Sequence, residues 1–419
     1  MSIVDDFEHL AKELHDDAEG LVREVANRVR QEALAHPQHF FALLRALKPV
    51  LVTDSIAIVT RYDDVVEVLE HDEAFSVSEY RRKMRELAGD FILGLDDSPA
   101  YEREVSILRL AAPRSDIPGL AAFAAAEAEQ IVSQAPGQID LVDLSSRVPA
   151  RLVGRWFGTP GPDEETQIAW TLALFADIFL NLQNDADLHT AAERAGAAMR
   201  PHLDSVIAAR KASGQAADDV LGRLIAMQGD PATAFSDEEI RTNFIGLIVG
   251  FIPTVMSATT LAFDALLERP DALAEACEAA RGDDDEALRA CMWEAMRLAP
   301  MAPGVVRRTA VDFEVAEGTH HATRIPAGAV TLAATQSAML DGDVLDDPSA
   351  FRTDRPSHHY LHFGAGMHEC FGRFANAMQI PAIAKAVLRR PGVRRAPGPE
   401  GALQRNEQYP TRLLVSFDA

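Results

Sequence analysis

The chain contains few cysteines and few cationic residues for its length. Only three of its 419 residues are cysteine, and they are widely spaced: Cys277, Cys291 and Cys370. Their number and spacing exclude a disulfide framework and favour a reducing compartment, so we expect a cytoplasmic protein. Lysine and arginine together number 40 against 64 aspartates and glutamates, which gives a formal net charge of −24. Because nucleic acids and anionic membranes bind basic patches, this charge argues against both as partners.

The sequence also lacks a segment that would direct it to or through a membrane. The longest apolar stretch, residues 244–256, is too short to cross a bilayer, so we expect no membrane span. The first residues, MSIVDDFEHLAKELHDD, have neither the basic start nor the apolar centre of a signal peptide. No linker rich in Gly, Ser or Pro divides the chain. Its length exceeds the usual range for one core, so several domains and one large helical domain are both open at this point.

The residues that are present predict a mainly helical chain. Residues 5–34 have the spacing of an amphipathic helix that precedes the main fold. Residues 48–70 contain two short β-branched runs, which indicate a hairpin, followed by a helix. Helical patterns dominate residues 100–300, and strand-like runs return at 313–335. The irregular stretch 341–372 that follows carries aromatics, histidines and glycines, which indicate a functional loop.

That stretch ends in FGAGMHECFG, residues 363–372, with a single cysteine just before a helical pattern. Glycines let a backbone turn tightly and approach a flat ligand closely. Amides at a helix start stabilise a thiolate, and such a thiolate is a strong axial ligand for haem iron that favours O–O cleavage. Two other interpretations stay open here. The cysteine could be a small buried apolar residue, or it could belong to a zinc site, although structural zinc sites normally use paired ligands and no second cysteine is near. The zinc ligands would come from His358, His359, His362, His368 and Cys370.

Two patterns in the sequence resemble the cytochrome P450 superfamily. The first is the spacing Phe-x-x-Gly-x-x-x-Cys-x-Gly, which resembles the family's haem-binding signature and is met by Phe363, Gly366, Cys370 and Gly372. The second lies upstream, in EAMR at 294–297, which is similar to the family's Glu-x-x-Arg.

Residues three apart share a face of a helix, so Glu294 and Arg297 can form an ion pair. In the family, an arginine from the meander that follows joins this pair, and Arg355 in AFRTDRP matches its position. The resemblance extends over residues 45–415, and it gives these three residues a structural role.

The resemblance implies a mainly α, triangular, single-domain cytochrome P450 fold with small β-sheets. Residues 41–419 would form the haem-thiolate domain, and residues 1–40 would form an N-terminal amphipathic helical extension. It also implies haem b, iron-protoporphyrin IX, as the cofactor. Cys370 would then be the proximal ligand of the metal.

Other residues match cofactor-binding positions of the family. His368 and Arg307 would each hold a haem propionate, with Arg308 as the competing choice for the arginine. Residues 95–113 resemble a helix that carries further propionate partners, but Tyr101 replaces its histidine and Val105 replaces its arginine. The cofactor-binding set that the resemblance implies is Cys370, His368, Arg307, Phe363, Gly364, Gly366, Gly372 and Tyr101.

The sequence departs from the family in the helix expected on the distal side of the haem. The family pattern there is (Ala/Gly)-Gly-x-(Asp/Glu)-Thr, in which the acid and the threonine relay protons during oxygen activation. Residues 250–254 read GFIPT, so Phe251 replaces the small residue, Pro253 replaces the acid and Thr254 is kept. We assign these three residues to the catalytic region and expect Phe251 to face the haem or the substrate. Proline removes a backbone donor, which would free the carbonyl of Val249.

These features predict a haem-thiolate monooxygenase that inserts oxygen into a small apolar or amphipathic molecule. Ferredoxin-type proteins would supply its electrons, and it would act as a monomer. Because Pro253 replaces an acid that assists O–O cleavage, an alternative stays open. That alternative is a peroxygenase or a hydroperoxide-rearranging enzyme that uses a pre-formed O–O bond in chemistry on a fatty-acid-like substrate. A third interpretation is a non-catalytic, haem-based ligand binder.

The residues around the substrate are open to two readings. A basic run would either clamp a substrate carboxylate or form a solvated face: Arg81, Arg82, Lys83 and Arg85. Two aromatic residues further along, Phe175 and Phe179, would either line the pocket or pack in the core.

Overall fold

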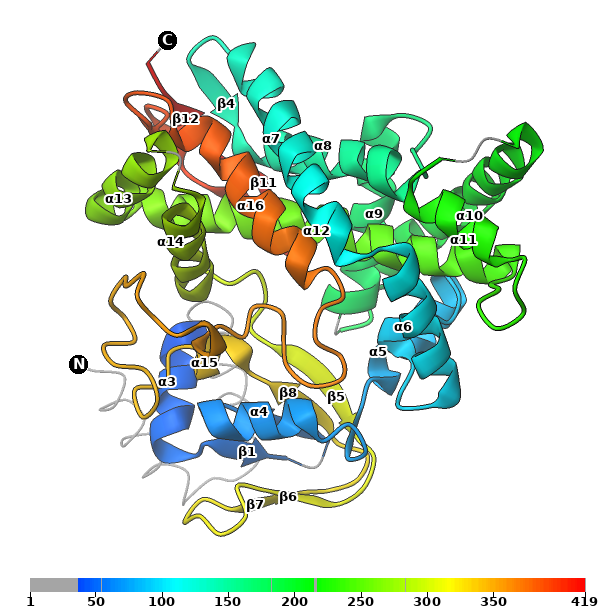
Figure 1. Cartoon of the computed structure of the whole chain (residues 1–419). Coiled ribbons are helices and arrows are strands. Elements are labelled where there is room, and N and C mark those ends of the chain that lie inside the picture. The colour runs from blue at the N-terminus through cyan, green and yellow to red at the C-terminus, as the bar shows by residue number, and fades with distance from the viewer. Residues whose placement is uncertain (1–36, 54, 182, 215–216, 283, 419) are drawn as a thin grey trace.

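The computed structural model describes residues 37–53, 55–181, 183–214, 217–282 and 284–418. The helix predicted over residues 5–34, and with it most of the 1–40 extension, lies outside the described residues. Within them, long helices gather on one side of the molecule and the larger sheet lies on the other, with α3 and α4 packed beside it (Figure 1). The predicted mainly α fold with small sheets is confirmed.

The helices of the described residues alternate with short helical turns. The α-helices are α3 (Pro37–Leu47), α4 (Tyr62–Glu70), α5 (Ser78–Leu87), α6 (Pro99–Ala111), α7 (Ile117–Ser133), α8 (Leu141–Leu152), α9 (Glu164–Phe175), α10 (Ala186–Ser213), α11 (Val220–Met227), α12 (Asp237–Leu267), α13 (Pro270–Arg281), α14 (Asp285–Leu298), α15 (Thr335–Ala338) and α16 (Arg373–Leu388). Two π-helical turns, η3 (Val153–Phe157) and η4 (Ala176–Leu180), continue α8 and α9. The 3₁₀ turns are η1 (Ile92–Gly94), η2 (Arg114–Asp116), η5 (Ser357–His359) and η6 (Pro399–Gly401).

The strands form four small sheets. The largest has the order β1 (Val50–Val52), β2 (Ile56–Val59), β8 (Val330–Ala333), β5 (Val305–Thr309) and β3 (Phe75–Ser76). A second sheet has the order β4 (Gln138–Asp140), β12 (Leu414–Ser416) and β9 (Arg394–Arg395). Two hairpins complete the set: β6 (Phe313–Val315) with β7 (Thr323–Ile325), and β10 (Gln404–Arg405) with β11 (Pro410–Arg412). The predicted hairpin near residue 54 is confirmed as antiparallel β1–β2, and the strand-like runs at 313–335 become β6, β7 and β8.

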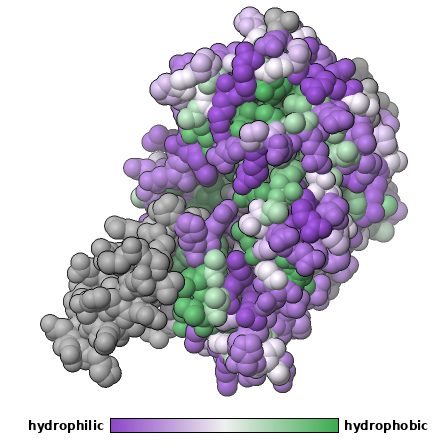
Figure 2. Space-filling view, turned by 90° about the vertical axis from the view of Figure 1, so that its left-hand side faces the viewer, coloured by the Kyte–Doolittle hydropathy of each residue, from purple (hydrophilic) through white to green (hydrophobic). Residues whose placement is uncertain are grey.

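Helix α12 is the central element of the helical layer. A capping box starts it, because the Ser236 hydroxyl accepts from the amide of Glu239 and the Glu239 carboxylate accepts from the amide of Ser236. Its length and hydropathy would suffice to cross a bilayer, but 83% of its most apolar window is buried inside the fold. The apolar run 244–256 is therefore the middle of a core helix. The face shown in Figure 2 is mostly hydrophilic, and its apolar residues gather in narrow strips.

A buried ion pair fastens the irregular stretch 341–372 to helix α14. The guanidinium of Arg297 donates to both carboxylate oxygens of Glu294 at 2.8 and 2.7 Å, and both side chains are fully buried. Arg297 also donates to backbone carbonyls of the stretch and its approach, at Met339 and Pro348. Arg355 donates to Glu294 at 3.1 Å, so the three residues meet as predicted.

The same contacts keep the Glu294 carboxylate charged. Burial by itself raises the pKa of this carboxyl group, but hydrogen bonds and charge from Arg297 and Arg355 outweigh burial and leave the pKa below its ordinary value. Because this charged pair is buried, its polar atoms need hydrogen-bond partners within the protein. Backbone groups of the loop provide them: the carbonyl of Ala350 accepts from Arg297, and the amide of Arg352 donates to Glu294. The loop that ends at Cys370 is therefore held by a charge pair on a helix.

Candidate active site

The Cys370 loop closes on itself just before helix α16. The amide of Cys370 donates to the carbonyl of Phe363 at 2.8 Å. Gly364 and Gly366 both have left-handed φ values, +71° and +72°. A Cβ atom at Gly366 would also lie 2.3 Å from the carbonyl oxygen of Leu69, so only glycine fits there. The glycines of the motif are therefore explained by this turn and its close contact.

Backbone amides beside Cys370 favour its thiolate. Burial raises the pKa of the Cys370 thiol to about 11, and the amides of Gly372 and Arg373, at the start of α16, act in the opposite direction. A metal cation deprotonates a coordinating thiol outright. The same amides would stabilise a metal-bound thiolate.

Strand β5 separates the two candidate arginines by its alternation of faces. Arg307 points inward and is 5% exposed; its Nη1 donates to the carbonyl of Val306, and its Nε has no partner among the described residues. Arg308 points outward, where it donates to the carbonyl of Gly328 and pairs with Glu79. Burial lowers the pKa of Arg307. The choice left open by the sequence falls on Arg307.

His368 is the second buried polar residue beside the loop. Its Nδ1 has no partner among the described residues, and burial lowers its pKa to about 4. Buried polar atoms without protein partners are rare in native proteins and usually bind an ordered water, an ion or a ligand. An orphaned guanidinium nitrogen and an orphaned imidazole nitrogen fit a carboxylate-bearing group. Together with the Cys370 donor set, they fit a haem with its propionates.

Tyr101 supports the loop in this structure. Its hydroxyl donates to the carbonyl of Met367 at 2.7 Å, and its ring lies edge-on to the ring of His368, with centroids 5.3 Å apart. The hydroxyl has one proton, and it is used in the hydrogen bond to Met367. In this structure Tyr101 therefore has no proton to donate to a haem propionate, the role that the family resemblance implies. Val105, at the position of the family's arginine, is a buried core residue.

One face of α12 borders open space. Between residues 242 and 263, only Leu247, Gly250 and Thr254 are not fully buried, and their spacing places them on one face. A Cβ atom built at Gly250 would meet nothing within 4 Å. The Thr254 hydroxyl donates to the carbonyl of Gly250 at 2.6 Å. This face therefore presents the side chain of Thr254 toward open space.

The structure corrects the expectation that Phe251 faces the haem or the substrate. Phe251 is 4% exposed and belongs to the main core. Its ring packs against Phe157 and Trp156 of η3, with centroids 5.4 and 6.4 Å away. One residue turns a helix by 100°, which moves Phe251 away from the open face of Gly250 and Thr254.

Pro253 is buried inside α12, which continues through it. Proline has no amide hydrogen, so the carbonyl of Val249, four residues earlier, lacks its helical donor. Helix α12 contains no aspartate or glutamate between Glu239 and Asp264. Pro253, at the position of the family's acid, therefore lies directly before Thr254, which keeps its hydroxyl.

The basic run in α5 does not form a free clamp. Arg81 and Arg85 pair with Asp90 at 3.2 and 2.7 Å, and Lys83 lies 3.4 Å from a carboxylate oxygen of Asp177. Only Arg82 of the run is exposed without a partner among the described residues.

The two aromatic residues after this run differ in burial. Phe175 is 6% exposed and belongs to the core, whereas Phe179 is partly buried and its ring lies 5.2 Å from that of Tyr80. Of the two, only Phe179 keeps a surface that could line a pocket.

The zinc interpretation of the histidine-rich loop finds no support. Among the described residues, one group of His, Cys, Asp and Glu brings its ligand atoms close enough for a metal, and it lies elsewhere, at Glu86, His189 and Glu193. His362 instead bonds the carbonyl of Trp293 at 3.0 Å. Sequence reasoning missed Trp293, whose ring lies edge-on to Phe363 at 5.1 Å and connects α14 to the Cys370 loop.

A fold of this kind, with a partly buried thiol at the start of a helix and two orphaned anion partners, defines a haem-thiolate oxidoreductase. The family model described as Cytochrome P450 matches residues 167–398, and the chain belongs to the cytochrome P450 family. It is an enzyme of the P450 monooxygenase type, and its cofactor is haem iron.

Relatives and solved structures agree with this membership. The chain is 26% identical over 348 residues to the mycinamicin IV hydroxylase/epoxidase of Micromonospora griseorubida, which covers 80% of this chain and 82% of that protein. It is 33% identical over 123 residues to a bifunctional dioxygenase-epoxy alcohol synthase of Pyricularia oryzae, which is 29% of this chain but only 11% of that protein. The crystal structure of CalO2 shares the fold, with a TM-score of 0.80 at 23% identity over 92% of this chain and 97% of the other.

The two arginines of β5 provide a test of the haem site. We expect Arg307→Gln to weaken haem retention by about 10- to 100-fold, because a hydrogen bond to a charged group contributes about 1.5–3 kcal/mol. Arg308→Gln, the neighbour on the outer face, is the matched control and should retain haem normally. Haem loss to an excess of a scavenging protein measures both. Equal loss from the two variants would contradict the assignment of Arg307.

Proposed function

We propose that this protein inserts one oxygen atom into a small apolar or amphipathic molecule bound against the open face of α12. The observation that carries the proposal is the Cys370 sulfur under the amides of Gly372 and Arg373, beside the orphaned Arg307 and His368. Haem b, held by these residues, would supply the oxygen-activating redox chemistry when bound. The low cysteine content supports a cytoplasmic location.

The chain's own contribution to proton delivery would come from Thr254. Its hydroxyl donates to the carbonyl of Gly250 and keeps acceptor lone pairs free on the open face of the helix. A water bound to the freed carbonyl of Val249 would be a further proton donor. Since Pro253 cannot carry a proton, a water or the substrate itself has to supply it. General acid assistance contributes about 10²- to 10⁴-fold, so proton delivery would be slow in this enzyme.

A second function is favoured by Pro253 itself. An enzyme that uses a peroxide or a fatty-acid-like hydroperoxide starts from an existing O–O single bond. It does not need the proton relay that prepares dioxygen for O–O cleavage. An epoxy alcohol contains the same atoms as an unsaturated hydroperoxide, so it can form by rearrangement. The name of the Pyricularia oryzae relative, a dioxygenase-epoxy alcohol synthase, agrees with such chemistry.

The outer surface beside α16 supports an electron-transfer partner for the first function. Leu110 and Phe374 are exposed there by 58% and 39%, and the Arg114 guanidinium lies 3.7 Å from the centroid of the Phe374 ring. This apolar and cationic surface, next to the Cys370 loop in sequence and fold, suits a small acidic protein of the ferredoxin type.

The oxidant is tested by two substitutions at one position. Pro253→Ala restores the amide donor to Val249 without an acid, and Pro253→Asp restores both. We expect Pro253→Asp to raise product formation per electron consumed, with dioxygen and a redox chain, by about 10²-fold. Pro253→Ala should remain within a few-fold of the wild type. With hydrogen peroxide or a lipid hydroperoxide, the two variants should differ little from the wild type.

The outcome separates the interpretations. An equal gain in both variants would show that the proline acts on the backbone and would overturn the relay argument. Turnover by the wild type with a hydroperoxide alone would select the second function. A lack of turnover with every oxidant over a broad substrate panel would leave the non-catalytic ligand binder.

A further inference from the structure

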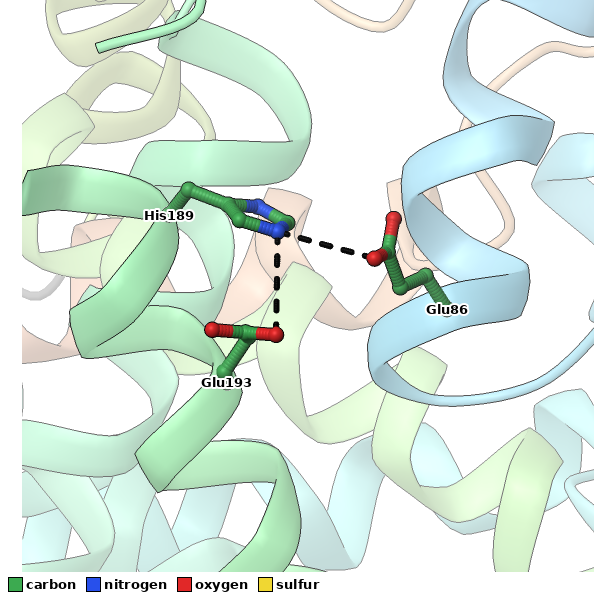
Figure 3. A group of neighbouring side chains, drawn as sticks. All are labelled: Glu86, His189 and Glu193. Atoms are coloured by element: carbon green, nitrogen blue, oxygen red, sulfur yellow. Dashed lines mark ion pairs between the residues drawn. The ribbon is translucent and has the colours of Figure 1, made fainter. Parts of the chain in front are cut away.

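Three potential metal ligands meet between helices α5 and α10, outside the haem site (Figure 3). The Nε2 atom of His189 lies 3.6 Å from Oε1 of Glu86 and 3.9 Å from Oε1 of Glu193. All three ligand atoms lie within 4.8 Å of one another, and no other group of His, Cys, Asp and Glu in the described part of the chain does this.

His189 is held in the orientation that metal binding needs. Its Nδ1 lies 2.9 Å from Oδ2 of Asp177, whose side chain is fully buried. The other oxygen of Asp177 accepts from the amide of Asn181 at 2.6 Å and faces the ammonium of Lys83 at 3.4 Å. The buried carboxylate therefore accepts a hydrogen bond from Nδ1–H of His189, and Nε2 faces the two glutamates. A carboxylate behind a histidine in this way is the usual outer support of a histidine that binds a metal.

The backbone holds the two helices at the distance the site requires. A Cβ atom at Gly196 of α10 would lie 2.5 Å from the carbonyl of Leu87, so α10 and the end of α5 are in direct contact. Lys83 of α5 donates to the carbonyl of Asn181 at 2.7 Å, just before α10 begins. Glu193 follows His189 by one helical turn and shares its face. The three ligands therefore stand on two helices that are already packed together.

We propose that Glu86, His189 and Glu193 bind one divalent transition-metal ion of the zinc class and so join α5 to α10. A tetrahedral zinc ion with ligands at about 2.1 Å separates its ligand atoms by about 3.4 Å. The distances of 3.6 and 3.9 Å need only small side-chain movements to reach that value. An imidazole with two carboxylates suits such an ion, and its charge removes the repulsion between the two glutamates. Both glutamates are about half exposed, which leaves a further position on the ion for water.

The test measures zinc bound to the haem-loaded protein by equilibrium dialysis and elemental analysis. A proton competes for Nε2 of His189, because Asp177 and the two glutamates raise the pKa of this histidine, so the buffer is mildly alkaline. We expect His189→Asn to lose one equivalent of zinc relative to the wild type. The matched control is His202→Asn on the same helix, which should bind as much zinc as the wild type. Asp177→Asn should weaken binding by about 10- to 100-fold.

Two further variants keep the test decisive if a change at His189 disturbs folding. Glu86→Gln lies on α5 and does not touch Asp177, so it should lose most of the zinc affinity while its haem spectrum stays normal. Glu317→Gln, which removes an exposed glutamate elsewhere, should change nothing. Zinc should also slow amide hydrogen exchange in α5 and the start of α10 of the wild type alone. Equal zinc binding by wild type, His189→Asn and Glu86→Gln would overturn the proposal.

Discussion

Replacing Cys370 with alanine is expected to abolish the thiolate Soret band of the reduced, carbon monoxide-bound protein. The band requires a thiolate on the iron, and Cys370 is the cysteine that lies in the glycine loop under the amides of Gly372 and Arg373. The absorption spectrum of the carbon monoxide complex measures the effect directly. We expect a complete loss of the band, the largest spectroscopic change that a single substitution would cause in this protein.

Two comparisons make this result specific. Cys277→Ala removes a buried thiol that lies on α13, so the band should stay unchanged. Cys370→His supplies another axial donor and should keep haem bound while the thiolate band is lost. A thiolate band that survives in Cys370→Ala would contradict the assignment of the proximal ligand.

Replacing Glu294 with glutamine should destabilise the protein by about 3–5 kcal/mol, the expected cost of removing one partner from a buried ion pair. The substitution leaves the charges of Arg297 and Arg355 without a carboxylate in a region from which water is excluded. It also weakens the hold on the loop that ends at Cys370, so haem retention should fall as well. Unfolding of the haem-loaded protein by denaturant, followed by the far-ultraviolet signal of its helices, measures the loss.

Helix α14 contains its own control for this prediction. Glu286 and Arg289 form a pair with the same spacing of three residues, but their side chains are 77% and 38% exposed. Glu286→Gln should therefore change the free energy of unfolding by less than about 1 kcal/mol, because water already screens the pair. Similar losses in Glu286→Gln and Glu294→Gln would show that burial does not set the strength of the Glu294 pair.

Features of the site that depend on local chain geometry could be predicted from the sequence. The turn at Gly366 needs a residue without a side chain, and Cys370 lies two residues before Gly372, beside the first amides of the helix that follows. The pair Glu294–Arg297 follows from helical spacing alone. The β1–β2 hairpin and the helices of the middle region likewise follow from short-range patterns.

Other features depend on which distant segment of the chain lies opposite a side chain, and local sequence patterns do not predict such contacts. Phe251 was expected at the haem because of its register beside Thr254, yet its ring packs against aromatic side chains of η3 on another face of α12. The hydroxyl of Tyr101 meets the carbonyl of Met367, which is 266 residues away in the chain.

The choice between Arg307 and Arg308 is also a matter of tertiary structure, because it depends on which face of β5 is covered. The meeting of Glu86 with His189 depends on how α5 and α10 pack. The sequence alone was therefore enough to predict the Glu294–Arg297 pair and to propose Cys370 as the haem ligand, because each depends on contacts within about one turn of the chain. The directions of side chains toward partners far along the chain came only from the packing of helices and strands, because that packing sets which faces meet.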